Sequence, residues 1–295
     1  MHLLHRRHFS LTALSACAAA LIPTAARSRS ADAQALPSFE EIERSARGRM
    51  GIAVLDTATG SLQGHRLDER FPMCSTFKWL AAAHVLHRVD RNEERLDRRV
   101  TYGRDVLVSH SPLTEPHAGK DGMTMGELCH ATITQSDNAA ANLILNTLGG
   151  PQGLTAFARM AGDDVTRLDR WETELNEATP GDPRDTTSPR AMAQLLKTLV
   201  LGELLSTSSR AQLAQWMQAT TTNRNRLASG LPGGWRVGSK TGTGGRGSTN
   251  DVGIYWPPGR PPVVAVAYLT ASSADMPVRE GAIARVAHSV FEARR

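Results

Sequence analysis

Three short motifs in this 295-residue chain carry residue types that can perform acyl transfer. Ser75 and Lys78 lie in Ser-Thr-Phe-Lys, Ser136 begins Ser-Asp-Asn, and Lys240 begins Lys-Thr-Gly. A serine hydroxyl becomes an effective nucleophile only when a neighbouring base takes its proton. A lone Ser-x-x-Lys is common and most simply indicates a helix cap followed by an exposed lysine. The three motifs in this order favour a serine nucleophile instead.

The segment that follows Ser75 should position this nucleophile. The run from Thr76 to Val89 is rich in Ala and Leu, which predicts a helix. Residues three apart lie on one face of a helix, so Lys78 Nζ is expected to reach Ser75 Oγ. The N-terminus of a helix also directs backbone N–H dipoles to the place where an oxyanion would form.

The apolar pattern predicts the elements around these motifs. Ser38 and Glu41 form a capping box that opens a helix ending near Arg47. Strands are predicted at 51–56, 62–66, 235–237, 252–256 and 263–269, helices through most of 73–217 (including 191–199 and 209–220), and a final helix at 283–293.

This order of elements predicts an α/β fold of the α+β type. An antiparallel sheet flanked by helices is built from both ends of the chain, and an all-helical domain is inserted between them. The predicted boundaries are 28–72 with 218–295 for the α/β domain and 73–217 for the helical domain.

Charge argues against a nucleic-acid partner. The formal net charge is +5, but residues 1–30 contain four arginines and no acid, and the rest of the chain has 30 basic against 29 acidic residues. No basic patch interleaved with aromatic residues follows. We therefore expect a small-molecule substrate.

The N-terminus predicts export. Arg6 and Arg7 resemble a twin-arginine motif, and an apolar run and small residues near Ala26 follow. We expect an export signal at 1–27, the twin-arginine translocon as a partner, and a periplasmic location. Lipidation at Cys17 is the alternative. An anchor helix is disfavoured because a membrane span takes about 20 apolar residues, more than this run contains. No other segment of the chain is apolar enough to span a membrane.

The sequence predicts neither a metal nor a cofactor. Cys74 and Cys129 are expected to be free, buried thiols. His84 and His87 lack further ligands at metal-binding spacing, which favours a solvated helix face. The glycines at 242–247 match a nucleotide-loop pattern, but a strand follows them where a helix would be required.

Four segments give the chain a resemblance to the class A serine β-lactamases over residues 38–293, with a β-lactamase/transpeptidase-like fold. The segments are FPMCSTFK at 71–78, QSDNAAANL at 135–143, DRWETELNEATPGDPRDTT at 169–187 and WRVGSKTGTGG at 235–245. Residues 169–187 resemble the Ω-loop of that family. This resemblance implies that Glu172 and Asn176 position the hydrolytic water and that an Arg170–Asp185 ion pair closes the neck of the loop.

The resemblance also implies a catalytic cycle. Ser75 attacks the β-lactam carbonyl, and the backbone N–H groups of Ser75 and Thr243 hold the oxyanion. Ser136 relays a proton to the lactam nitrogen, and Asn138 binds the substrate's side-chain amide. Glu172 serves deacylation, whereas the acylation base is either Lys78 or Glu172 acting through water.

The rest of the implied substrate site lies near the third motif. Its predicted members are Lys240, Thr241, Gly242 and Thr243, with His110 at the rim. Thr249 replaces an arginine that many family members use to bind the substrate carboxylate. Arg226 is expected to supply that charge, and Arg224 is the competing candidate.

Departures from the family pattern bear on the substrate spectrum. Some members carry a disulfide between the positions of Cys74 and Gly244, and others between those of Cys129 and Ala82. Because Gly244 and Ala82 are not cysteines, both disulfides are expected to be absent, and carbapenem hydrolysis is not supported. The glycines at 242, 244, 245 and 247 are expected to leave the pocket edge roomy, which suits cephalosporins as well as penicillins.

Two other functions share the acylation chemistry. A D-alanyl-D-alanine peptidase or transpeptidase does not need Glu172 and Asn176. A non-hydrolytic β-lactam sensor acylates and stops, and is usually tethered by a membrane helix. We expect a monomeric hydrolase.

Overall fold

The computed structural model describes residues 36–294. The expected export signal, with Arg6, Arg7 and Cys17, lies outside the described residues. Within them, none of the helices combines the length and apolar character that a membrane crossing requires.

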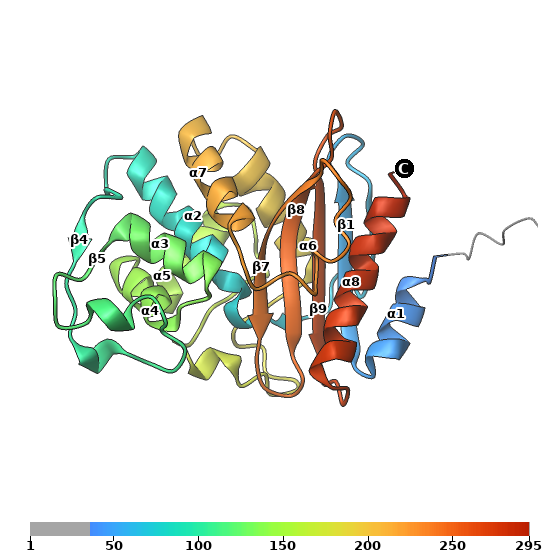
Figure 1. Ribbon diagram of the computed structural model, residues 1–295, viewed down its shortest axis with the longest axis horizontal. Coiled ribbons are helices and arrows are strands. Elements are labelled where there is room, and N and C mark those ends of the chain that lie inside the picture. The colour runs from blue at the N-terminus through green and yellow to red at the C-terminus, as the bar shows by residue number, and fades with distance from the viewer. Residues whose placement is uncertain (1–35, 295) are drawn as a thin grey trace, which may run out of the picture. The chain divides into compact units, whose positions relative to one another are not determined.

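A five-stranded antiparallel sheet organises one side of the molecule (Figure 1). Its spatial order is β2-β1-β9-β8-β7. The strands are β1 (Arg49–Asp56), β2 (Leu62–His65), β7 (Arg236–Thr243), β8 (Thr249–Trp256) and β9 (Val263–Thr270). Arg49 of the first strand pairs with Thr270 of the last one, so both ends of the chain build the sheet.

Helices cover both faces of this sheet. On one face, α1 (Phe39–Ala46) and α8 (Met276–Glu292) pack together, and their apolar residues form a core with the sheet that includes Ile42, Tyr255 and Phe291. On the other face, α6 (Pro189–Leu196) contacts β1 and β9. The predicted capping box is present, because Ser38 Oγ accepts from Glu41 N and the Glu41 carboxylate accepts from Ser38 N.

The remaining helices form the side of the molecule that carries the first two motifs (Figure 1). They are α2 (Phe77–Asp90), α3 (Met125–Thr134), α4 (Asn138–Thr147), α5 (Gly150–Met160) and α7 (Thr207–Gln218), with the π-helix η5 (Lys197–Leu201) and the short 3-10 helices η1 (Cys74–Thr76), η2 (Arg104–Val106), η3 (Glu115–His117) and η4 (Glu174–Asn176). Two short ribbons pair β3 (Phe71–Pro72) with β6 (Thr186–Thr187) and β4 (Arg99–Val100) with β5 (Met123–Thr124).

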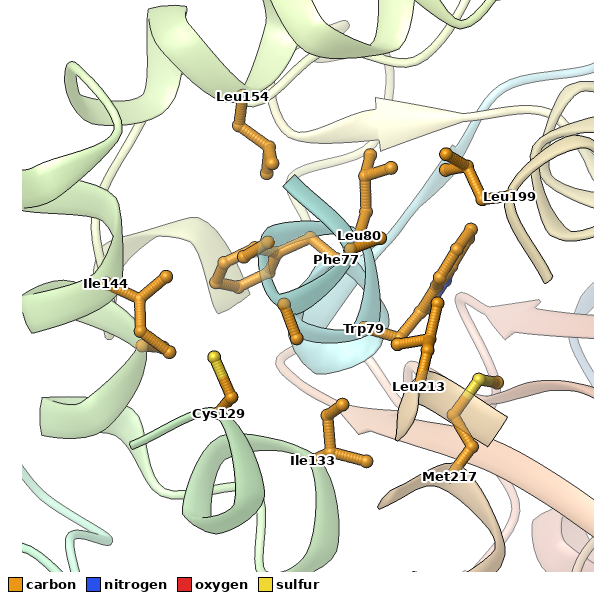
Figure 2. Packing of buried hydrophobic residues seen from close by; sticks show 14 of the residues in the cluster. Phe77, Trp79, Leu80, Cys129, Ile133, Ile144, Leu154, Leu199, Leu213 and Met217 are labelled. Carbon is orange, nitrogen blue, oxygen red and sulfur yellow. The ribbon is translucent and has the colours of Figure 1, made fainter. Parts of the chain in front are cut away.

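Helix α2 is the centre of the second core. A helix that is apolar all round is stable only when it is surrounded by protein, and Phe77, Trp79 and Leu80 are fully buried here. Figure 2 shows side chains of α3, α4, α5 and α7 pointing at α2 from several sides, among them Ile133 and Leu213. Helix α2, which follows Ser75 directly after η1, is therefore packed from several directions.

The predicted fold class is confirmed, and the detailed differences are local. Strand β7 runs to Thr243, six residues beyond the predicted end at Val237. Cys74 and Cys129 are free and buried, as predicted. The prediction for His84 is wrong: its ring stacks on Phe157 with centroids 4.3 Å apart, because the face of α2 that carries it packs against α5.

Candidate active site

Ser75 lies in η1, immediately before α2, and its side chain reaches across to the Ω-loop. Only 8% of the residue is exposed, and its Oγ donates to Glu172 Oε1 at 3.1 Å. The i, i+3 spacing had predicted a contact with Lys78. Lys78 Nζ and Ser75 Oγ both contact Glu172 Oε1, at 2.9 Å and 3.1 Å, and a direct contact between the two side chains stays a prediction.

Lys78 connects three of the predicted site residues. Its Nζ lies 2.9 Å from Glu172 Oε1 and 2.8 Å from the carbonyl oxygen of Ser136. It also donates to Asn138 Oδ1 and, at 3.4 Å, to Ser136 Oγ. Burial lowers the pKa of this amine, although the charge and hydrogen bond of Glu172 oppose that change. A lysine in this setting can release and recover a proton.

Glu172 is positioned by amides on both sides. Asn176 Nδ2 donates to its Oε2 at 2.5 Å. Behind it, Asn142 Oδ1 accepts from Glu172 N at 3.0 Å, and Asn142 Nδ2 donates to Glu172 O at 2.9 Å. The carboxylate thus has one oxygen directed at Ser75 and the other held by the Ω-loop.

Ser136 is placed between two lysines. It adopts a positive φ of 59° two residues before α4 begins, and its Oγ accepts from Lys240 Nζ at 3.0 Å. Burial and the charge of Lys78 lower the pKa of Lys240 well below its ordinary value, whereas the charges of Asp251 and Glu172 act in the opposite direction. The hydroxyl of Ser136 therefore joins the first and third motifs.

The middle residue of the second motif holds a loop at the rim. Asp137 is fully buried and caps α4 by accepting from Ala140 N at 2.9 Å. It also accepts from Leu113 N at 2.8 Å and from Thr114 N at 3.0 Å. This anchors the exposed loop that carries His110, whose Nε2 lies 2.9 Å from Gln135 O.

The end of β7 packs closely against the segment that precedes Ser75. A Cβ atom added at Gly242 would lie 2.8 Å from Met73 O, and one at Gly244 would lie 2.6 Å from Cys74 Sγ. The backbone and Cys74 therefore fill the space into which a side chain at these two glycines would point. The expectation of a roomy pocket edge stays a prediction. Asn250 of β8 fixes the same contact by donating to Pro72 O at 2.9 Å and Met73 O at 3.1 Å.

Arg226 lies behind the end of β7 and is only 5% exposed. Its Nη1 donates to Gly242 O at 3.0 Å and to Asn250 O at 2.9 Å. Its Nη2 donates to Thr243 Oγ1 at 3.0 Å, and Glu280 Oε1 pairs with its Nε at 3.1 Å. The neighbouring Arg224 is exposed.

Hydroxyl groups continue the polar edge of β7. Thr241 Oγ1 lies 2.6 Å from Thr222 Oγ1, a residue of the same loop that carries Arg226. On β8, Thr249 Oγ1 accepts from Arg279 Nη1 at 3.2 Å.

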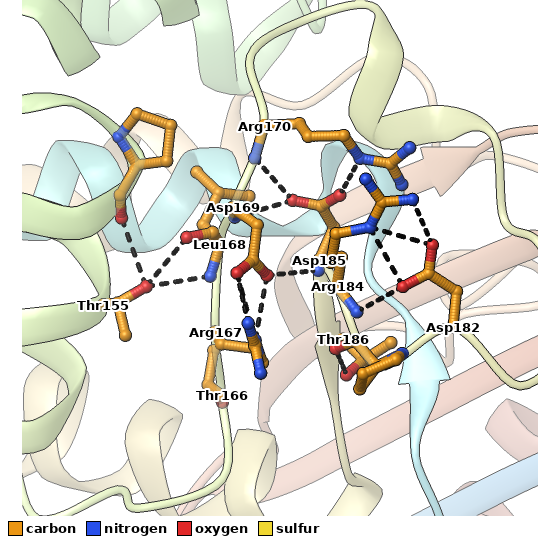
Figure 3. A network of polar contacts seen from close by, with 12 residues as sticks. Thr155, Thr166, Arg167, Leu168, Asp169, Arg170, Asp182, Arg184, Asp185 and Thr186 are labelled. Carbon is orange, nitrogen blue, oxygen red and sulfur yellow. Dashed lines mark hydrogen bonds and ion pairs between the residues drawn. The ribbon is translucent and has the colours of Figure 1, made fainter.

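The neck of the Ω-loop is closed by a buried carboxylate (Figure 3). Asp185 Oδ2 pairs with Arg170 Nε at 2.6 Å, and its Oδ1 accepts from Asp169 N at 2.8 Å and Arg170 N at 2.9 Å. Burial disfavours the charged form of Arg170, but its hydrogen bonds to Asp185 and Glu177 raise its pKa overall. The predicted Arg170–Asp185 ion pair is present.

The three motifs and the Ω-loop thus meet at one place, and no His, Cys, Asp and Glu group suited to a metal occurs within residues 36–294. Sequence reasoning missed the supporting roles of Asp137, Asn142 and Asn250. One signal was available for Asn142, which follows Asn138 by four residues and therefore shares its helix face. Asn250 gave none, because its contact depends on strand register.

The chain resembles known proteins over nearly all of its described length. A family described as the β-lactamase enzyme family matches residues 36–293. Beta-lactamase L2 from Stenotrophomonas maltophilia is 46% identical over an alignment 295 residues long, gaps included. The alignment covers 96% of this chain and 97% of that protein.

Solved structures agree with the sequence relatives. An ancestral (GNCA) class A β-lactamase has a TM-score of 0.85 and 61% identity, covering 86% of this chain and 98% of its own. The putative class A β-lactamase PenP from Rhodopseudomonas palustris has a TM-score of 0.85 and 58% identity, covering 86% of this chain and 97% of its own.

Proposed function

This chain belongs to the β-lactamase enzyme family and is a class A β-lactamase that hydrolyses β-lactams, and from that membership we propose that it acts through an acyl-enzyme on Ser75. The observation that carries the proposal is the contact of Ser75 Oγ with Glu172 Oε1 at 3.1 Å. A hydroxyl that already donates to a buried carboxylate is prepared to lose its proton when it attacks a carbonyl.

Acylation requires a proton path from the nucleophile to the leaving nitrogen. The Ser75 proton can pass to Glu172 or, through the contact of that carboxylate, to Lys78. Lys78 also contacts Ser136 Oγ, which Lys240 approaches from the opposite side. We assign Ser136 the delivery of a proton to the lactam nitrogen, so that the nitrogen leaves as a neutral amine when the C–N bond breaks.

Deacylation requires a water molecule and a base. Glu172 is the proposed base, because Asn176 holds one of its oxygens and Asn142 fixes its backbone. Water attacks the Ser75 ester, Glu172 takes its proton, and the serine oxygen leaves with a proton returned to it. A peptidase or a sensor has no need of a carboxylate in this position, which favours the hydrolase.

Substrate binding is proposed along the end of β7. Penicillins and cephalosporins carry a carboxylate next to the lactam ring, and Lys240, Thr241, Thr243 and Arg226 offer cations and hydroxyl donors for it. The backbone N–H groups of Ser75 and Thr243 are assigned to the oxyanion. Asn138 and His110 are assigned to the substrate's side chain. Neither metal nor cofactor is needed for these steps.

A trapping experiment tests the catalytic assignment. In Glu172→Ala, intact-protein mass spectrometry after addition of benzylpenicillin should show the mass of the drug retained on the enzyme. Glu174→Ala is the matched control, since Glu174 is an exposed acid two residues away. Hydrolysis by Glu172→Ala at the parent rate would reject Glu172 as the base. The variant Ser75→Ala should show no added mass after the same treatment, and a drug adduct on it would reject Ser75 as the acylated residue.

Turnover counting separates the hydrolase from its alternatives. Purified enzyme mixed with a chromogenic cephalosporin should consume many equivalents per active site. A single stoichiometric burst would instead identify a sensor.

The cellular setting is also proposed. The pattern around Arg6 and Arg7 supports export through the twin-arginine translocon and a periplasmic location, with lipidation at Cys17 as the alternative. We also propose that the enzyme acts as a monomer. Hydrolysis in the periplasm would destroy β-lactams before they reach their targets and so confer resistance.

A further inference from the structure

A cavity behind the Ω-loop carries an unusual concentration of arginines. Its volume is about 200 Å³, and it lies between the Ω-loop segment 178–184 and the sheet-side residues Arg49, Arg70 and Thr270. Arg170 and Arg184 line it from the loop side. Asp182 is the one carboxylate among its described lining residues.

Arg70 has no carboxylate partner among residues 36–294. Its Nη1 donates to Val165 O at 2.9 Å and to Thr186 Oγ1 at 3.1 Å, and both partners are neutral. By contrast, Arg49 pairs with Glu69 at 2.9 Å. One positive charge at this cavity is therefore uncompensated by the surrounding protein.

The two loop arginines repel each other. Arg170 pairs through Nε with Asp185 and through Nη1 with Glu177, each at 2.6 Å, and Arg184 pairs with Asp182 at 2.6 Å. The charge of Arg184 nevertheless acts against protonation of Arg170. Figure 3 shows both guanidinium groups on the same side of Asp185. An anion between them would reduce this repulsion.

We propose that this cavity is a binding site for a small oxyanion, held by Arg70 together with Arg170 and Arg184. Guanidinium groups present paired N–H donors that match the oxygens of phosphate, sulfate or a carboxylate. The volume of about 200 Å³ suits an inorganic anion with a few waters, each of which takes about 30 Å³. Bound there, the anion joins the Ω-loop to the sheet side without touching Ser75 or Glu172.

Inorganic phosphate is the first probe. Thermal unfolding of the full enzyme should show a midpoint that rises with phosphate and saturates, compared with sodium chloride at matched ionic strength. Calorimetric titration should then give a dissociation constant that Arg70→Gln weakens at least tenfold. Arg44→Gln is the control, because Arg44 is an exposed arginine whose side chain is 73% accessible.

Two further arms define the ligand and its place. Repeating the titrations with sulfate and with bicarbonate identifies which oxyanion binds. Weaker binding of any of these anions by Arg70→Gln supports the site. Hydrogen exchange should slow in residues 179–184 when the anion binds. If Arg70→Gln fails to fold, Arg184→Gln replaces it. Absence of binding for all three anions, equal effects with chloride, or binding unchanged in the variants would overturn the proposal.

Discussion

Arg226 Nη2 donates to Thr243 Oγ1 at 3.0 Å, although one residue lies in the loop after α7 and the other at the end of β7. The same guanidinium contacts Gly242 O and Asn250 O through Nη1. It therefore holds the strand end in place as well as supplying charge there. Thr249, where the family resemblance had implied an arginine, pairs with Thr243 across the strands. We propose that the charge for the substrate carboxylate comes from Arg226 instead.

Replacing Arg226 tests this assignment. Arg226→Ala should raise KM for penicillins about tenfold or more, because losing a charge-assisted hydrogen bond costs about 1.5–3 kcal/mol. Steady-state kinetics on benzylpenicillin measures the effect. Arg224→Ala is the matched control and should leave KM unchanged, since Arg224 is exposed. The opposite pattern would transfer the role to Arg224.

Removing the amide behind Glu172 should slow deacylation. Asn142→Ala deletes both hydrogen bonds to the Glu172 backbone, so the carboxylate loses its fixed position. We expect kcat to fall about 10- to 100-fold, with more acyl-enzyme at steady state. Rapid-quench mass spectrometry measures that fraction. Asn146→Ala, an exposed site one turn later on α4, should behave as the parent. An unchanged acyl-enzyme fraction in Asn142→Ala would contradict the role.

Asp251 predicts a pH dependence of stability. Its side chain is fully buried, Oδ2 accepts from Leu227 N at 3.1 Å, and Oδ1 has no partner among the described residues. Burial raises the pKa of this carboxyl from 3.8 to about 6, although the charges of Arg226 and Lys240 act against it. The folded state therefore holds a proton that the unfolded state releases. This contribution to stability is complete below pH 3.8 and is lost as pH rises through about 6.

The variant Asp251→Asn removes this titration. Its unfolding free energy relative to the parent should increase between pH 4 and pH 8 by an amount on the order of 3 kcal/mol. Urea unfolding at several pH values gives the difference. A difference that is constant over this range, or that falls, would show that Asp251 is ionised throughout.

Close packing at Gly244 predicts a sensitive position. A Cβ there would lie 2.6 Å from Cys74 Sγ and 2.7 Å from Asn176 O. Gly244→Ala should lower the unfolding free energy by about 1–3 kcal/mol and displace the Ω-loop, so kcat should fall as well. Gly281→Ala on α8 meets no atom within 4 Å and should be neutral or stabilising. Equal midpoints for the two variants in thermal unfolding would refute the packing argument.

Export is tested in cells. Replacing Arg6 and Arg7 with Lys should reduce periplasmic activity in a host that has the twin-arginine translocon. In a host without that translocon, the parent should show the same reduction. Undiminished activity in both settings would eliminate this route.

The sequence predicted the family, the fold class and much of the local structure. The capping box at Ser38 and the strand at 263–269 followed from local pattern alone, and both are present. The end of β7 was missed because Gly238–Thr243 has two glycines and few β-branched residues, so its strand conformation depends on pairing with β8.

Other errors arose from tertiary contacts that periodicity does not encode. His84 was expected to face solvent, but the partner that covers it, Phe157, comes from another helix. Helix spacing predicted that Lys78 reaches Ser75, but it did not indicate that acceptors from the second motif and the Ω-loop also hold the lysine amine. The role of Asn250 likewise depends on a strand neighbour far away in sequence.

The pairing of Arg49 with Thr270 means that the sheet cannot be completed until both of these distant segments have been synthesised. Ser75 leaves the ribosome early, whereas β9, the strand that joins β1 to the rest of the sheet, is the last strand to emerge. Contacts between such distant residues close a very long loop, and this slows folding. A nascent chain therefore carries Ser75 long before Asn250 and Arg226 can complete the surroundings of that residue.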